Sequence, residues 1–196
     1  MSYFRNICFV LLLPAPVLHA SPIALSGANY GGTGCPAGSV VAALSPDQST
    51  VSIYFEKYMA QTGANKRLDR KACGLAIPLH VPAGYSVAVA GVDFEGFNSL
   101  PAGARARLSV EQFFAGATSR GAKVKTFAGP LQDVFSSADA LGPNLLVWSA
   151  CGKDTIVRVQ SSLLLLSNTS RSAVSMIDRA NSIGGLRYSL MWRRCH

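Results

Sequence analysis

Residues 40–55 read VVAALSPDQSTVSIYF, and the pattern of this stretch decides the fold. Its second half alternates the apolar residues Val51, Ile53 and Phe55 with more polar neighbours, which is the two-residue period of a half-buried strand. A Ser-Pro-Asp segment separates this half from the apolar run at residues 40–44, and its proline and aspartate favour a turn. The two runs are therefore predicted to pair as a β-hairpin.

Comparable short runs, separated by glycine and proline, continue to the end of the chain. They predict strands at residues 73–81, 85–94, 105–114, 122–127, 145–149, 155–166, 172–178 and 186–194. Pro78 cannot donate a ladder hydrogen bond, so its strand should lie at a sheet edge or carry a bulge. The pair Ser161-Ser162 interrupts the alternation of another strand and predicts a bulge or a bend between sheets. Since no window has the spacing of an amphipathic helix, we expect an all-β fold, an antiparallel β-sandwich or jelly-roll-like single domain.

The first 20 residues have the features of a secretory signal peptide. Arg5 supplies the positive charge, residues 7–18 form an apolar run, and the small residue Ala20 precedes Ser21-Pro22. The run is too short to span a bilayer, which needs about 20 apolar residues. We predict cleavage near Ala20, a flexible glycine-rich lead-in at residues 21–34 and a single domain at residues 35–196. This predicts a secreted protein, extracellular or periplasmic.

Four cysteines follow this leader. An even number of cysteines in an exported chain predicts disulfides, and four allow three pairings. Pairing Cys35 with Cys73 and Cys151 with Cys195 encloses the shortest loops and joins strands expected to be neighbours. It also places one disulfide in each half of the domain. We therefore favour this pairing over the other two.

Eight sequence pieces carry a resemblance to a known family. They are GGTGCPAGSV (31–40), YMAQTG (58–63), KACGL (71–75), PLHVPAGY (78–85), VDFEGF (92–97), FAGP (127–130), VWSACG (147–152) and LMWRRC (190–195). In this order, and with the four cysteines, they resemble the secreted family known as domain of unknown function 4360, found in bacteria and fungi. Glu95 departs from it, because the family tends to have arginine there. The resemblance implies a secreted, cysteine-bonded, mostly β protein and carries over no catalytic residue.

The sharpest chemical feature is a pair of carboxylates. Asp93 and Glu95 lie two positions apart on a predicted strand, so they share a face and could divide acid and base roles or hold a cation. The alternative is a polar strand end before the turn at Gly96. Only His80 and His196 follow the leader, and neither a Gly-x-Ser-x-Gly elbow nor a zinc-ligand spacing occurs. We therefore predict no catalytic residue, metal or cofactor, with a carboxylate-pair hydrolase as the alternative.

Two tryptophans and one asparagine are candidates for contacts with glycans. Trp148 and Trp192 each precede a cysteine by three positions. They are interpreted as core or disulfide-shielding residues, or, if exposed, as surfaces that stack on sugar rings. Asn168-Thr169-Ser170 is an acceptor sequence for N-glycosylation in an organism that glycosylates its secreted proteins.

The charge of the chain is strongly positive. Removal of Arg5 with the leader lowers the net charge from +8 to +7. A basic cluster at residues 66–71 is interpreted as a solvated loop, or as a contact for phosphate or acidic polysaccharide. Nucleic acid is disfavoured because no stacking aromatics are interleaved with these charges. Two functions remain, a non-catalytic binding or structural module for a wall polymer, glycan or host surface, and an extracellular polymer hydrolase.

Overall fold

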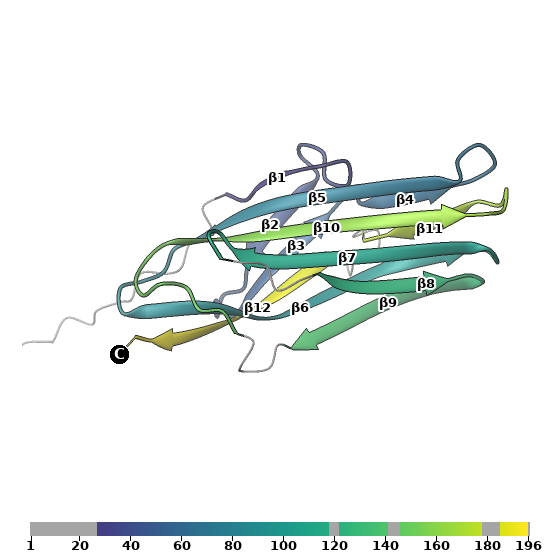
Figure 1. The fold of residues 1–196 in the computed structure, drawn as a ribbon. Helices are drawn as coiled ribbons and strands as arrows, with labels where there is room; N and C mark the ends of the chain where they lie inside the picture. Colours follow the sequence, from purple (N-terminus) through teal and green to yellow (C-terminus); the bar gives the residue numbers. More distant parts are fainter. Residues whose placement is uncertain (1–26, 118–121, 141–145, 178–184, 196) are drawn as a thin grey trace, which may run out of the picture.

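A computed structural model describes residues 27–117, 122–140, 146–177 and 185–195 (Figure 1). The predicted signal peptide and its cleavage site lie outside these residues. The described chain forms strands and contains no helix long and apolar enough to cross a membrane. The strands are β1 (Asn29–Gly31), β2 (Val40–Leu44), β3 (Thr50–Phe55), β4 (Met59–Thr62), β5 (Leu68–Leu79), β6 (Tyr85–Leu100), β7 (Ala104–Phe114), β8 (Lys123–Ala128), β9 (Leu131–Ala140), β10 (Thr155–Ser167), β11 (Ala173–Met176) and β12 (Gly185–Arg194).

The strands form two antiparallel sheets that pack face to face as a β-sandwich, the predicted fold class (Figure 1). Sheet A has the order β1-β5-β10-β7-β8. Sheet B has the order β2-β3-β12-β6-β11-β4, and β9 pairs with the second half of β6. The predicted hairpin of β2 and β3 is confirmed, with Val40 opposite Phe55.

The core lies between the sheets because each strand turns alternate side chains inward. On β10, Val157, Val159, Leu163 and Leu165 are at most 4% exposed, whereas Arg158 and Gln160 between them face solvent. Burial of these inward rows supplies the main driving force for packing the two sheets together. Polar residues are thereby left on the outer faces, where a ligand can reach them.

The predicted bulge at Ser161-Ser162 is wrong. Strand β10 pairs without a register shift along both β5 and β7. Ser161 occupies an inward position because its hydroxyl is satisfied there. It accepts a hydrogen bond from the Tyr58 hydroxyl at 3.0 Å and donates one to the Cys73 carbonyl at 3.3 Å.

The prediction for Pro78 agrees with the position of its strand. β5 pairs with β10 along its length, but the short β1 reaches only as far as Ala76 on the other side. Within the described residues, β5 is therefore an edge strand at Pro78, where a missing N–H costs no ladder hydrogen bond.

The interpretation of residues 66–71 as a loop is corrected, because β5 begins within this segment at Leu68. The inward position of Asp69 explains the difference. Its carboxylate accepts a hydrogen bond from the Gln61 backbone N–H at 2.9 Å and forms an ion pair with Lys66, also at 2.9 Å. With Asp69 anchored inward, Arg70 points outward from sheet A.

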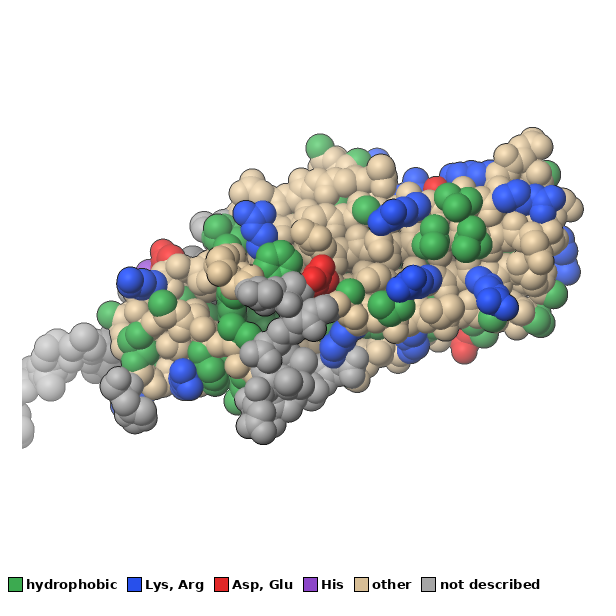
Figure 2. Space-filling model, in the orientation of Figure 1, with side chains coloured by type: hydrophobic (Ala, Val, Ile, Leu, Met, Phe, Trp, Pro, Cys, Tyr) green, Lys and Arg blue, Asp and Glu red, His purple; other side chains and the backbone are tan. Residues whose placement is uncertain are grey.

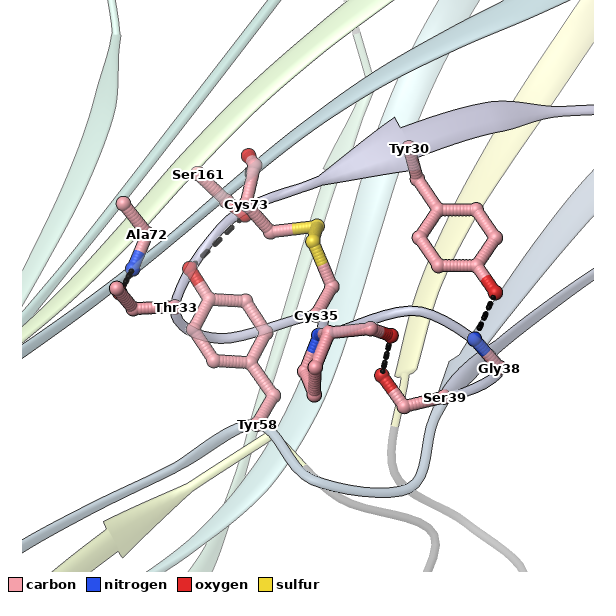
Figure 3. The surroundings of a disulfide bond; sticks show 10 residues. Tyr30, Thr33, Cys35, Gly38, Ser39, Tyr58, Ala72, Cys73 and Ser161 are labelled. Carbon is pink, nitrogen blue, oxygen red and sulfur yellow. Dashed lines mark hydrogen bonds between the residues drawn. A yellow bond between two sulfur atoms is a disulfide. The ribbon is translucent and has the colours of Figure 1, made fainter.

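The expected flexible lead-in is not flexible in its second half, since residues 29–31 form β1 and pair with β5. The segment that follows lies against the first disulfide, around which Figure 3 shows Thr33, Tyr58 and Ala72. Thr33 accepts a hydrogen bond from the Ala72 N–H at 3.1 Å. A Cβ atom on Gly34 would lie 2.4 Å from the Tyr58 ring, so this glycine is required for close packing and not for mobility.

The two disulfides differ in their exposure. Cys35 pairs with Cys73, and Cys151 pairs with Cys195, the two pairs that enclose the shortest loops. Cys35 and Cys73 are buried between the sheets at 0% and 2% exposure. Cys151 is exposed and Cys195 half-buried at the end of β12.

This difference predicts the order of reduction. Thiol–disulfide exchange requires a thiolate to reach one of the sulfur atoms, so Cys151–Cys195 should open first under a mild reductant. Alkylation during a reductant titration, followed by peptide mapping, measures the order. Alkylation of Cys35 and Cys73 before or together with the other pair would contradict the burial seen here.

Two buried tyrosines predict how the fold responds to alkali. Burial raises the pKa of Tyr58 to about 12, and burial also raises the pKa of Tyr188. Unfolded tyrosines titrate near 10, so the folded chain holds both protons more tightly. Stability should therefore be complete below pH 10 and fall as the pH rises from about 10 to 12. Phenolate absorbance of these tyrosines should appear together with the loss of near-ultraviolet dichroism.

Single hydroxyl deletions provide a control for this prediction. The Tyr188 hydroxyl is buried without a hydrogen-bond partner in the described part of the chain, so Tyr188→Phe should leave stability at neutral pH unchanged or raise it. Tyr58→Phe should lower the unfolding free energy by about 1 kcal/mol, because it removes the bond to Ser161. Alkaline unfolding unaffected by both substitutions would refute the role assigned to these phenols.

Candidate functional site

The outer face of sheet A is basic. The alternation of β5, β7 and β10 turns Arg70, Arg105, Arg107 and Arg158 outward, and all four are exposed. Figure 2 shows this face, on which blue side chains clearly outnumber red ones and gather toward the right-hand end. The turns before β5 and β7 and after β10 lie at that end in Figure 1.

A groove with a volume of about 260 Å³ lies on this face. Its floor consists of small residues in register across three strands, Ala72 and Gly74 on β5, Ser162 on β10 and Ser109 on β7. Arg70, Gln160 and Glu111 also line it. This volume is slightly below the range of about 300–1,000 Å³ that is typical of small-molecule pockets. The hollow is therefore described better as an open groove than as a closed site. We call this groove, with the adjoining Arg107 and Arg158, the basic groove.

The register explains why the groove is there. Arg70 and Arg107 flank Leu164 in one cross-strand row, and Ala72, Ser162 and Ser109 form the next row. Gly74 has ample space, since a Cβ atom there would have only the Gly31 carbonyl oxygen within 4 Å, at 3.9 Å. The change from long to short side chains between neighbouring rows produces the hollow.

The arginines of this face form no ion pairs with other described residues. Within the residues that the structure describes, no carboxylate lies within ion-pair distance of Arg70, Arg105, Arg107 or Arg158. The close contacts between basic and acidic side chains there are the Lys66–Asp69 ion pair and the contact of His80 with Asp154. Guanidinium groups bind carboxylate, sulfate and phosphate through paired hydrogen bonds. Their grouping without counterions therefore favours an anionic ligand.

Asp93 and Glu95 lie in the other sheet. Both line a shallow hollow on the outer face of sheet B, as their shared strand face predicted. Arg187 is the cross-strand neighbour of Asp93, and Gly185 is the neighbour of Glu95. A Cβ atom on Gly185 would lie 2.5 Å from the Ile53 carbonyl oxygen, so the hollow results from close backbone packing. Arg187 therefore lies on the neighbouring strand opposite Asp93, one of the two residues of the alternative acid–base pair.

The remaining titratable candidate, His80, is an exposed residue at the end of β5. Its Nδ1 lies 2.8 Å from an Asp154 carboxylate oxygen, and the same oxygen accepts a hydrogen bond from the Val81 N–H at 3.1 Å. Asp154 thus holds the turn after β5 in place. Among the described residues there is also no group of three His, Cys, Asp or Glu side chains placed to hold a metal ion.

The two tryptophans are half-buried, and each already contacts another part of the protein. Trp192 packs against the core and donates a hydrogen bond from Nε1 to the Gln48 carbonyl at 3.0 Å. The guanidinium carbon of Arg193 lies 4.2 Å from the centre of the Trp148 ring. Stacking of a sugar on either ring stays a prediction, and one face of Trp148 is occupied by Arg193. Asn168 is exposed in the turn after β10.

Sequence reasoning did not identify the basic groove. The sequence predicted a strand at residues 105–114, and Arg105 and Arg107, two positions apart, lie on one face of it. Arg70 and Arg158 join that face only because β10 pairs with both β5 and β7, and this pairing of distant segments has no local sequence signal.

Comparison with known proteins identifies the family. The model of a family described as Domain of unknown function (DUF4360) matches residues 21–195. The chain belongs to the DUF4360 family. A curated relative of this DUF4360 member is an "Uncharacterized secreted protein" of Arthroderma benhamiae, 30% identical over 173 residues, with 86% of this chain and 70% of the relative covered.

Two solved structures give weak matches to the DUF4360 chain. One is TmCBM61 in complex with beta-1,4-galactotriose, at 11% identity and a TM-score of 0.29, with 87% of this chain and 90% of that chain covered. The other is the enzymatically active domain of tailspike protein 4 from bacteriophage CBA120, at 11% identity and a TM-score of 0.25, with 90% and 20% covered. Scores this low do not bear on the function of the chain.

Proposed function

We propose that this protein is secreted and binds anionic polysaccharide at the cell exterior through the basic groove, without catalysing its turnover. The observation that carries the proposal is the set of four outward arginines on sheet A, none in an ion pair among the described residues, around a floor of small side chains. Guanidinium groups supply charge and directed donors, and the short side chains of the floor allow a sugar chain to approach the sheet.

Polysaccharide suits the groove better than a small anion does. The groove is open and crosses three strands, and its floor presents the hydroxyls of Ser109 and Ser162 and the amide of Gln160. Such groups donate to and accept from sugar hydroxyls. A compact anion such as phosphate would use the arginines and leave this polar floor unoccupied.

Secretion is supported by three independent observations. The N-terminal residues have signal-peptide features, both disulfides suit an oxidising compartment, and the curated relative carries the word secreted in its name. N-terminal sequencing of material from the medium or periplasm should begin within a few residues of Ser21. An intact, uncleaved chain in the cytoplasm would contradict this part of the proposal.

Binding is tested by titrating the secreted protein against polygalacturonate and a neutral glucan at low and high salt. We expect saturable binding to the acidic polymer, weak binding to the neutral one, and loss of the first as salt rises. The expected salt effect arises because the Debye length falls from about 10 Å at 0.1 M to about 3 Å at 1 M. Equal binding to both polymers at all salt concentrations would refute the proposal.

The alternative, a hydrolase that uses Asp93 and Glu95, is tested in the same samples. Released sugars are measured in parallel with binding, for the natural protein and for an Asp93→Asn, Glu95→Gln double variant. We expect no product from either protein and unchanged binding by the variant, because its substitutions lie on the opposite outer face. Steady product release that disappears in the variant would replace the binding proposal with the hydrolase.

A further inference from the structure

An apolar patch adjoins the basic groove on the outer face of sheet A. Leu68 on β5 and Leu166 on β10 are direct cross-strand partners, and they are 53% and 43% exposed. Leu164, two positions from Leu166 on the same strand, is half-buried on the same face. Because side chains opposite each other on paired strands lie within contact distance, the three leucines form one apolar surface. We call it the leucine patch.

Basic side chains border the leucine patch. Arg105 is the partner of Leu166 on the other side of β10, Arg67 lies in the turn before β5, and Arg171 lies in the turn after β10. All three arginines are exposed, and none forms an ion pair with another described residue. Figure 2 shows green side chains bordered by blue ones toward the right-hand end of this face.

The combination of adjacent leucines and arginines limits the kind of partner. Single exposed apolar residues are common on protein surfaces, whereas a group of them rimmed by polar residues marks an interaction site. Sugar hydroxyls would lack hydrogen-bond partners over leucine, so the polysaccharide of the neighbouring groove does not account for the patch. A second copy of this chain would bring the same arginines together in a symmetric contact, where like charges repel. A lipid surface with anionic headgroups matches both the apolar and the basic side chains.

We propose that this end of sheet A docks on the surface of an anionic lipid membrane. The leucines enter the boundary between headgroups and acyl chains, and Arg67, Arg105 and Arg171 contact headgroup phosphates, for which guanidinium groups supply paired donors. The patch lies at one end of the elongated sandwich, where a flat surface can reach it (Figure 1). The inference goes beyond the proposed function and does not depend on it.

Sedimentation with vesicles tests the docking. The secreted protein is mixed with vesicles of phosphatidylcholine alone, and with vesicles of phosphatidylcholine and phosphatidylglycerol in equimolar amounts. We expect binding to the anionic vesicles only. Part of this binding should persist at high salt, because salt screens charges and does not weaken the burial of leucine. No binding to the anionic vesicles, or equal binding to both kinds, would overturn the proposal.

The double variant Leu68→Ser with Leu166→Ser tests whether the patch makes the contact. Both side chains are exposed, so the core should stay intact, which near-ultraviolet dichroism checks. Binding to the anionic vesicles should weaken at least about tenfold, while binding to polygalacturonate in solution stays unchanged. Val41→Ser with Val134→Ser is the matched control, because it removes two exposed apolar side chains from β2 and β9 of the other sheet and should leave vesicle binding unchanged.

The outcomes separate this inference from the proposed function. If the natural protein binds anionic vesicles but not polygalacturonate, the proposed function fails and the docking site stands. If the leucine and valine double variants bind the vesicles equally well, the leucine patch is not the docking site. A dimer of the natural protein that the leucine variant abolishes, together with no vesicle binding, would assign the patch to a second copy of the chain and overturn the proposal.

Discussion

Replacing Arg70 and Arg107 together with glutamine should weaken binding to acidic galacturonan at least about tenfold, which is about 1.4 kcal/mol. The two guanidinium groups flank Leu164 on the outer face of sheet A, and neither has an ion-pair partner in the described residues. A hydrogen bond to a charged group contributes about 1.5–3 kcal/mol, and solvent exposure reduces that value. Glutamine keeps most of the side-chain length, so the loss reports the charge.

The matched control is Lys57→Gln with Arg194→Gln. Both residues are exposed and lie outside the groove, and the double substitution lowers the net charge by the same amount. It should retain most of the binding, with a decrease attributable to general attraction alone. Equal losses from the two double variants would show that the net charge of the protein binds the polymer, with no defined site.

Replacing Cys35 and Cys73 together with serine should lower the free energy of unfolding by about 4 kcal/mol. The bridge closes a loop with a sequence separation of 38, for which the chain-entropy model predicts this value. The disulfide also anchors the segment in which Gly34 packs on Tyr58, so its removal releases β1 from sheet A. Native domains have only about 5–15 kcal/mol of stability, so the variant should be close to unfolding at physiological temperature. Chemical denaturation followed by fluorescence measures the loss.

The second disulfide supplies the comparison. Its sequence separation of 44 predicts nearly the same entropic term, so Cys151→Ser with Cys195→Ser isolates the effect of burial. Because Cys151 is exposed, we expect the smaller loss of stability from this pair. A larger loss from Cys151 and Cys195 than from Cys35 and Cys73 would contradict the structural role given to the buried bridge.

The sequence predicted those parts of the fold that depend on neighbouring residues. The β2–β3 hairpin follows from a local alternation and a proline-containing turn, and comparable short runs predicted the strands at residues 105–114 and 155–166. The disulfide pairs could be favoured because loop length depends only on positions along the chain. In each case the feature depends either on residues within one short segment or on the number of residues between two positions.

Other features depend on strand pairing between distant segments. β10 lies between β5 and β7, although 40 residues separate it from β7 and 75 from β5 along the chain. Only this arrangement brings Arg158, Arg70 and Arg107 onto one face. The sequence predicted a flexible lead-in at residues 21–34, because it does not show that Ala72 packs against Gly32 and Tyr58 against Gly34. The sequence predicted a bulge or a bend at Ser161-Ser162, because the partner of the Ser161 hydroxyl, Tyr58, is 103 positions away.

The most direct test of the central claim is the affinity of a Gly74→Leu variant for polygalacturonate. Leucine changes no charge, and the backbone at residue 74 has room for a Cβ atom, with the nearest contact at an ordinary 3.9 Å. Its side chain would occupy the exposed floor of the groove without disturbing the core. If the polymer binds in the basic groove, the affinity should fall at least about tenfold while stability is unchanged, which corresponds to about 1.4 kcal/mol of lost binding. Binding equal to that of the natural protein, in a variant that is as stable, would show that the groove is not where the polysaccharide binds.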